Sequence, residues 1–298
     1  SDMRSMQVPM KVGLLGTVNS EGLPHLTLIT TLQPSEPRQV IWGQFTEGFC
    51  KRFVRENGKT GFLIMTADRR LWRGKTTFVR VASQGKEFEM YNAAPMFRYN
   101  AYFGVHTVYY MDLVEQYGQE VLPTKRIVRA VIKTMLARSL ARKRPESVLN
   151  PWTRQLMNRA SNLKFLSYVG ADGYPVIIPV VQAQALDSAR VMFSSSVYEA
   201  ELAAIPPRAT VAVFGMSLDM EDVLMRGELS LRRVGGIKCG VVDVRWVYNS
   251  MPPKPQQMYP EVALEAVRSF EGSDCSEAPG HDDRCAGLRA ARTRPSGH

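Results

Sequence analysis

The sequence predicts a mainly β protein with helices, in which one small β-barrel occurs twice along the chain. Three observations predict this fold class. Residues 15–33 and 166–184 match without a gap at an offset of 166 − 15 = 151. Short apolar stretches separated by turn residues recur around both segments. A helical pattern, which is rich in basic residues, lies between the two copies.

The repeat is carried by strand and turn positions. The first window matches the second at Leu15 with Leu166, Val18 with Val169, Gly22 with Gly173, Pro24 with Pro175, and Gln33 with Gln184. Val40 and Val191 keep the same offset, whereas Arg73-Gly74 match Arg226-Gly227 at 226 − 73 = 153. Two extra residues are easily accommodated in a loop. The maintained register predicts a tandem duplication that forms a pseudo-dimer within one chain.

Each element of the first copy has a local signal. Residues 12–18 and 26–32 are apolar and predict two strands, and the turn between them contains Gly22, which can take a positive φ. Further strands are expected at residues 40–45, 60–66 and 72–81, with a short basic helix at residues 49–57. Short strands at regular spacing favour a closed sheet, because closure leaves no open edge.

The second copy repeats this order. Strands are expected at residues 165–169, 176–182, 191–194, 210–216, 223–231 and 240–246, with a short helix at residues 199–205. We therefore divide the chain into a first, cofactor-binding barrel (residues 1–120), a basic helical linker (121–160), a second barrel (161–270) and a polar tail (271–298).

The linker helix is basic and amphipathic. Its apolar stripe consists of Ile127, Val128, Val131, Ile132, Met135, Leu136 and Leu140. Eight basic residues and no acidic residue lie between Lys125 and Arg144. Such a helix can lie on a membrane or on nucleic acid. We expect instead that the stripe packs on a barrel and that the charges face water, so that no nucleic acid is bound.

The composition is that of an ordinary folded domain, with 45% hydrophobic and 22% charged residues. No uncharged apolar stretch of about 18 residues occurs, so we expect no membrane span. The four cysteines include no CxxC pair, which predicts reduced thiols and a cytoplasmic location. Cys275, His281 and Cys285 do not have the spacing of a zinc site, so no metal is expected.

The order of these features resembles the FMN-binding split β-barrel of the pyridoxamine 5′-phosphate oxidase-like superfamily. The resemblance is carried by the turn within residues 17–25, the strand and loop at 42–46, the basic helix at 50–57, and Trp72-Arg73-Gly74. The second copy contributes residues 169–175 and 225–227. Proteins of this family are usually homodimers that bind FMN between two barrels. The resemblance therefore implies a site between the two copies, and a further homodimer remains open.

The resemblance also implies which residues bind FMN. The candidates are Thr30, Thr31, Trp42, Gly43, Gln44, Thr46, Lys51, Arg52, Trp72 and Arg73. Thr46, Lys51 and Arg52 stand where the family binds the phosphate, whose charge requires basic side chains. Residues 30–31 and 42–44 stand where it lines the flavin slot, and residues 72–73 could reach across between barrels. The equivalent stretch of the second copy contains Glu199 and Glu201, so we expect only one site.

The resulting hypothesis is an FMN-dependent oxidoreductase that transfers two electrons to or from a small organic substrate. The sequence identifies neither the substrate nor the electron donor. It also identifies no catalytic residue, because no nucleophile triad, carboxylate pair or phosphate-binding glycine motif is present. Two alternatives stay open. One is a split barrel that binds F420 or haem, for which His25 and His106 are the histidines within the barrels. The other is a non-enzymatic module that binds anions or nucleic acid.

Overall fold

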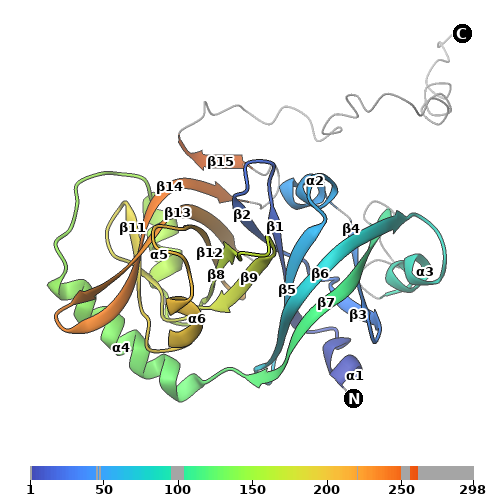
Figure 1. The fold of residues 1–298 in the computed structure, drawn as a ribbon, viewed down its shortest axis with the longest axis horizontal. Helices are drawn as coiled ribbons and strands as arrows, with labels where there is room; N and C mark the ends of the chain where they lie inside the picture. Colours follow the sequence, from blue (N-terminus) through green and yellow to red (C-terminus); the bar gives the residue numbers. More distant parts are fainter. Residues whose placement is uncertain are drawn as a thin grey trace, which may run out of the picture. The chain divides into compact units, whose positions relative to one another are not determined.

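The computed structural model describes residues 2–44, 46, 48–94, 104–219, 221–249 and 256–260. These residues form two antiparallel sheets that lie side by side (Figure 1). The mainly β fold class with helices is therefore confirmed. The predicted polar tail at residues 271–298, with Cys275, His281 and Cys285, lies outside the described residues.

The first sheet has the strand order β2-β1-β5-β6-β7-β4-β3. Its strands are β1 (Lys11–Val18), β2 (Pro24–Leu28), β3 (Gln33–Glu36), β4 (Gln39–Gln44), β5 (Lys59–Thr66), β6 (Arg70–Ala82) and β7 (Thr107–Val121). The turn between β1 and β2 forms as predicted. Gly22 takes a φ of 76°, and the Asn19 side chain accepts a hydrogen bond of 2.7 Å from the Leu23 N–H.

The helices of this half are α1 (Asp2–Met6), α2 (Phe49–Glu56) and α3 (Lys86–Asn92). The amphipathic pattern of α2 determines how it packs. Cys50, Phe53 and Val54 are buried against the sheet, whereas Arg52 and Arg55 face solvent. Lys51 lies at the border between the two faces and is also buried, with 8% of its surface exposed.

The second sheet has the order β10-β11-β14-β13-β12-β8-β9. Its strands are β8 (Leu163–Val169), β9 (Pro175–Pro179), β10 (Gln184–Ala185), β11 (Arg190–Ser194), β12 (Thr210–Met216), β13 (Asp222–Val234) and β14 (Ile237–Asn249), and β15 (Gln256–Tyr259) pairs with β14. The first sheet, followed from β3 to β2, shows the same arrangement. A shared order is what the predicted duplication requires, and the duplication itself stays a prediction.

One apolar core joins the two sheets. Leu26 and Leu63 of the first half belong to the same buried cluster as Phe165 and Phe214 of the second. The backbones also approach closely, because a Cβ atom on Gly61 would lie 2.2 Å from the carbonyl oxygen of Pro175. This position therefore requires glycine. Because the two backbones are in contact here, the residues that lie where the sheets meet are held in fixed positions relative to one another.

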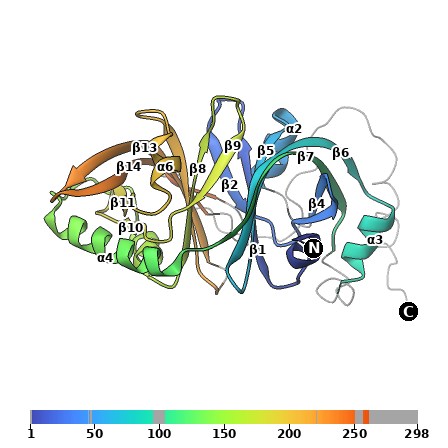
Figure 2. The same ribbon diagram turned by 60° about the horizontal axis from the view of Figure 1, so that its bottom comes forward.

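Two helices lie between the sheets in sequence, α4 (Thr124–Leu140) and α5 (Pro151–Asn158). Figure 2 shows α4 alongside the second sheet near β10 and β11. It packs through small or polar positions: Ala130 and Ala137 are fully buried, and the Thr134 hydroxyl accepts a hydrogen bond of 2.8 Å from the Ser194 N–H. Small side chains allow a helix to approach a strand closely.

This packing corrects the expectation for the apolar stripe of α4. Most of the stripe faces solvent: Val128, Ile132, Met135, Leu136 and Leu140 are each more than half exposed. Of the expected stripe, Ile127 is buried and Val131 is partly buried. The prediction was wrong because the spacing of apolar residues does not show that α4 packs through its small residues, Ala130 and Ala137. Among the described residues, no helix is long and apolar enough to cross a membrane.

Candidate functional site

The candidate site lies where β2 and α2 of the first sheet meet β13 and β14 of the second. The ring of His25 on β2 lies 6.4 Å from that of Trp246 and 5.7 Å from that of Tyr248, both on β14. The Phe49 ring of α2 lies 5.0 Å from that of Tyr248. We call the group of His25, Lys51, Arg226, Trp246 and Tyr248 the first junction.

Arg226 brings a buried positive charge to the first junction. It stands on β13, and its guanidinium carbon lies 3.8 Å from the centre of the Trp246 ring. Its Nε and Nη1 atoms are shielded from solvent and have no hydrogen-bond partner among the described residues. Burial lowers the pKa of Arg226, whereas the charge of Glu21 acts in the opposite direction. Burying a guanidinium that has no carboxylate partner lowers the stability of the fold, unless a bound anion balances its charge.

Lys51 adds a second cation, which comes from α2 of the first half. Its side chain is buried, and within the described part of the chain it takes part in no ion pair. Its neighbour Arg52 is different: it is exposed, pairs with Glu56 at 3.3 Å, and lies 5.2 Å from the centres of the Phe49 and Phe53 rings. Of the two predicted phosphate-binding residues on α2, only Lys51 is therefore held inside the junction.

His25 is a neutral group within this positive environment. It is 1% exposed, and its ring lies 5.3 Å from that of Phe53. Burial, with smaller contributions from the charges of Arg226 and Lys51, lowers the pKa of His25 to about 3. Its Nδ1 atom has no partner among the residues that the structure describes. A neutral imidazole with a shielded nitrogen can accept or donate one hydrogen bond to a ligand.

The other predicted site residues lie mostly inside the first sheet. Trp42 and Trp72 are both fully buried in the core of this sheet, and Trp42 stacks on Tyr109 with ring centres 3.9 Å apart. The buried Gln44 accepts a hydrogen bond of 2.8 Å from the Tyr109 hydroxyl. The structure thus uses these residues as packing, and they are not part of the first junction.

The threonines and Gly43 have separate surroundings. The Thr31 hydroxyl donates to the carbonyl oxygen of Gly43 at 2.9 Å and accepts from its N–H at 3.1 Å. The Thr30 hydroxyl is shielded and has no partner within the described chain. Thr46 is exposed. His106, the second histidine considered for haem, is also exposed, and its Nδ1 lies 2.9 Å from the Thr107 hydroxyl.

Arg73 crosses to the second half, as predicted, but at a different place. Its Nη1 donates to the Ile177 carbonyl oxygen at 2.9 Å and to Glu201 Oε2 at 2.8 Å. Its Nη2 donates to Glu120 Oε1 at 2.6 Å. Although burial acts to lower it, the carboxylates of Glu201 and Glu120 raise the pKa of Arg73. The Arg73 guanidinium is therefore bonded to groups of the protein itself.

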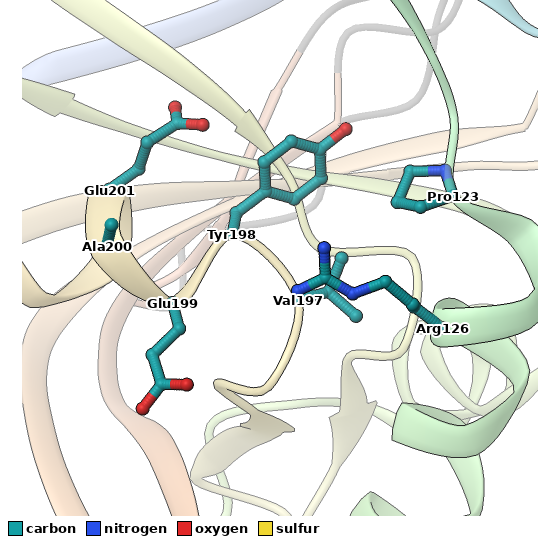
Figure 3. Close-up of a pocket in the computed structure, with 7 residues that line it drawn as sticks. All are labelled: Pro123, Arg126, Val197, Tyr198, Glu199, Ala200 and Glu201. Atoms are coloured by element: carbon teal, nitrogen blue, oxygen red, sulfur yellow. The ribbon is translucent and has the colours of Figure 1, made fainter.

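The surroundings of Arg73 form a second junction, defined as Arg73, Glu120, Tyr198, Glu199 and Glu201. It includes α6 (Glu199–Ala203), which follows β11 as α2 follows β4. A cavity of about 250 Å³ lies beside it, and Figure 3 shows Glu199 and Glu201 extending to different sides of α6. Lys238 pairs with Glu199 at 2.6 Å. The acidic character that the sequence predicts for this copy is therefore present.

Sequence reasoning missed Arg226, Trp246 and Tyr248 as site residues. Arg226 was available from the repeat, since it matches Arg73 at 226 − 73 = 153. The repeat implies that if one arginine reaches out from the first barrel, its counterpart reaches back from the second. No local signal distinguishes Trp246 and Tyr248 from core residues of a strand.

Comparison with known proteins gives a limited result. No family model and no curated protein matches the chain. Solved structures give weak likenesses. HupZ from Group A Streptococcus is 15% identical, with 39% of this chain and 90% of that chain covered and a TM-score of 0.32. An FMN-binding protein from Syntrophomonas wolfei is 14% identical, with 40% and 82% covered and a TM-score of 0.33.

A protein described as F420 reductase is 14% identical, with 37% of this chain and 91% of that chain covered and a TM-score of 0.31. PlzA from Borreliella burgdorferi, solved in complex with c-di-GMP, is 7% identical, with 81% of this chain and 83% of that chain covered and a TM-score of 0.24. Likenesses this weak assign no function to the chain.

Proposed function

We propose that this protein binds FMN at the first junction and uses it as a redox cofactor for a small organic substrate. The observation that carries the proposal is that two cations from different halves of the chain, Lys51 of α2 and Arg226 of β13, both act on the buried His25. No carboxylate is paired to either cation among the described residues. A phosphate group would supply the missing negative charge. The aromatic rings beside these cations suit the other part of the same ligand.

The residues of the junction fit the chemistry of FMN. Lys51 and Arg226 would hold the phosphate, and Trp246 and Tyr248 offer flat apolar surface next to them. Bound FMN supplies two-electron transfer through its ring. His25 stays neutral across the physiological range, because its pKa is lowered to about 3, so it adds a hydrogen-bonding nitrogen without adding charge. The rings of Phe49 and Phe53 lie 6.1 and 5.3 Å from the ring of His25.

The first test is the visible absorption spectrum of the purified protein, with the released chromophore identified by its mass. We expect a two-banded flavin spectrum and released FMN. A deazaflavin mass or a haem Soret band would assign the junction to a different cofactor and contradict FMN. A colourless protein that takes up no added FMN would contradict cofactor binding altogether and leave the non-enzymatic alternative.

A pair of variants on α2 makes the test specific to the junction. Lys51→Ala should weaken FMN binding at least tenfold, because it removes a buried cation that donates charge-assisted hydrogen bonds, worth about 1.5–3 kcal/mol each. Arg52→Ala is the matched control, since its guanidinium is exposed and already pairs with Glu56. Equal losses in both variants would mean that general surface charge, rather than the junction, attracts the phosphate.

A further inference from the structure

The second half of the chain contains a basic cavity that is separate from both junctions. Its volume is about 420 Å³, within the range of small-molecule sites. It is lined by the last turns of α4, the chain that follows α4, one side of α5, and residues 185–188 beside β10. Four cations from these segments line it: Arg138, Lys143, Arg144 and Arg154.

The carboxylates near this cavity neutralise only one of these four cations among the described residues. Asp187 is the acidic residue in the lining, and it already accepts bonds from Arg190 Nε at 3.0 Å and from the Arg144 backbone N–H at 3.0 Å. Arg144 pairs through its side chain with Asp243 at 2.8 Å. Asp187 is therefore bonded to Arg190, and of the four cations only Arg144 forms an ion pair within the described residues.

The remaining three cations have no carboxylate partner among the described residues. Arg138 Nη1 donates only to neutral amide oxygens, those of Asn158 at 3.2 Å and Gln184 at 3.3 Å. The Arg154 side chain has no hydrogen bond or ion pair in the described chain, and its Nε atom is shielded from solvent. Lys143 is exposed and likewise unpaired within the described ranges. Three unpaired cations around one cavity create a strong preference for an anion.

We propose that this cavity binds a phosphorylated small metabolite that carries at least two negative charges. Guanidinium groups match phosphate oxygens in geometry, and Arg138 and Arg154 approach the cavity from two different helices. Pro151 and Ala185 provide apolar wall for the organic part of the ligand. The site does not depend on the proposed FMN function, because it shares no residue with the first junction.

The test is isothermal titration calorimetry of the full chain with inorganic pyrophosphate at physiological salt. We expect saturable binding of one pyrophosphate in this cavity. Arg154→Met keeps an unbranched apolar side chain at this position and removes its charge, and it should weaken binding at least tenfold. Lys143→Met, which changes only an exposed side chain, should weaken it several-fold and is the second variant if Arg154→Met does not fold.

A matched control separates this cavity from other surface cations. Arg159→Met changes an exposed arginine at the end of α5 that lies 3.8 Å from Glu221 and does not line the cavity. This variant should bind pyrophosphate as the unchanged protein does. Loss of binding in the control, or unchanged binding in Arg154→Met, would overturn the proposal.

Discussion

At the scale of single residues, Arg73 and Arg226 show how one residue type at corresponding positions can have opposite roles. The two lie 226 − 73 = 153 residues apart, and both extend from the sixth strand of their half, β6 or β13, towards the other half. Arg73 bonds to two carboxylates and a carbonyl oxygen. Arg226 has a ring face and shielded nitrogens without partners among the described residues. Arg73 therefore holds the structure together, whereas Arg226 remains available to an anion.

This difference predicts the effect of Arg226→Met. Without ligand, the free energy of unfolding should stay the same or rise, because the variant removes a shielded charge and keeps most of the packing. The dissociation constant for FMN should rise at least tenfold. Urea unfolding and FMN titration measure the two effects. Arg245→Met, on the exposed side of β14, is the control and should change neither. A clear loss of stability in ligand-free Arg226→Met would contradict the assignment.

His25 predicts a dependence of stability on pH. The unfolded histidine takes up a proton below its ordinary pKa of 6.5, whereas the folded one does so only near its pKa of about 3. The unfolded state therefore binds more protons between these values, and stability is lost as the pH falls below about 6.5. At pH 5 the loss should be about 2 kcal/mol for this one group.

The His25→Phe variant should lack this loss, since phenylalanine fits among Phe49 and Phe53 and does not titrate. Urea unfolding at pH 7.5 and at pH 5 measures the difference. His106→Phe serves as the control because His106 is exposed. If the unchanged protein and His25→Phe lose the same stability between the two pH values, His25 is not buried as a neutral group.

Part of the site could be predicted from single residues, and part could not. Lys51 was identified because a basic helix after the third strand is where the resembling family binds phosphate. Trp42, Gln44 and Trp72 were included by the same reasoning, but alternation along a strand decides which side chains point inward, and here they enter the core. Trp246 comes from the other half of the chain, and local patterns contain no information on which distant strand will face α2.

At the scale of elements, continuous apolar stretches were the best guide. Residues 60–66 and 210–216 are predicted as strands, and the structure has β5 (Lys59–Thr66) and β12 (Thr210–Met216), which are both buried nearly throughout. The strand predicted at residues 26–32 ends earlier, at Leu28. There the Ile29 N–H bonds to the Gly13 carbonyl oxygen, and the chain turns with a 3.1 Å bond from the Leu32 N–H to the Ile29 carbonyl oxygen. β10 spans only Gln184–Ala185 and is too short to leave a pattern.

The two faces of α4 give a prediction at this scale. Ala137 is fully buried beside Met192 and Val241, whereas its neighbour Leu136 is 54% exposed. Ala137→Glu should lower the free energy of unfolding by more than about 3 kcal/mol, because it buries an unpaired charge. Leu136→Glu should change it by no more than about 0.5 kcal/mol. Urea unfolding of both variants measures this. If Leu136→Glu lowered the free energy of unfolding more than Ala137→Glu, the apolar stripe predicted from the sequence would be the buried face of α4.

At the scale of the whole molecule, the two halves are connected by a shared core and by the bonds of Arg73 to Glu201 and to the Ile177 carbonyl oxygen. Arg73 is 3% exposed, whereas Glu120 and Glu201 are 26% and 37% exposed. Glu120→Gln/Glu201→Gln leaves a buried cation without a partner and should cost about 3 kcal/mol, the low end for a buried pair because the carboxylates are partly screened by water. Arg73→Met should cost less, since the two carboxylates can regain hydration. Urea unfolding that ranks the two variants the other way would contradict this account of the second junction.

The organisation into two halves was predictable because the repeat keeps one offset through several strands, and the shared strand order agrees with it. The further association of two chains and a cytoplasmic location stay predictions. The acidic character of α6 was predictable, because Glu199 and Glu201 stand where α2 has basic residues. A single cofactor site per chain stays a prediction. Only the three-dimensional structure shows that Arg73 and Arg226 each extend towards the opposite half of the chain.

The stoichiometry of FMN binding tests the assignment of the cofactor to the first junction. It is measured by titrating cofactor-free protein and following the change in flavin fluorescence. We predict one FMN per chain, with binding lost in Lys51→Ala/Arg226→Ala and retained in Arg73→Met. Two FMN per chain, or binding that survives the double variant and disappears in Arg73→Met, would contradict the assignment of the cofactor to the first junction.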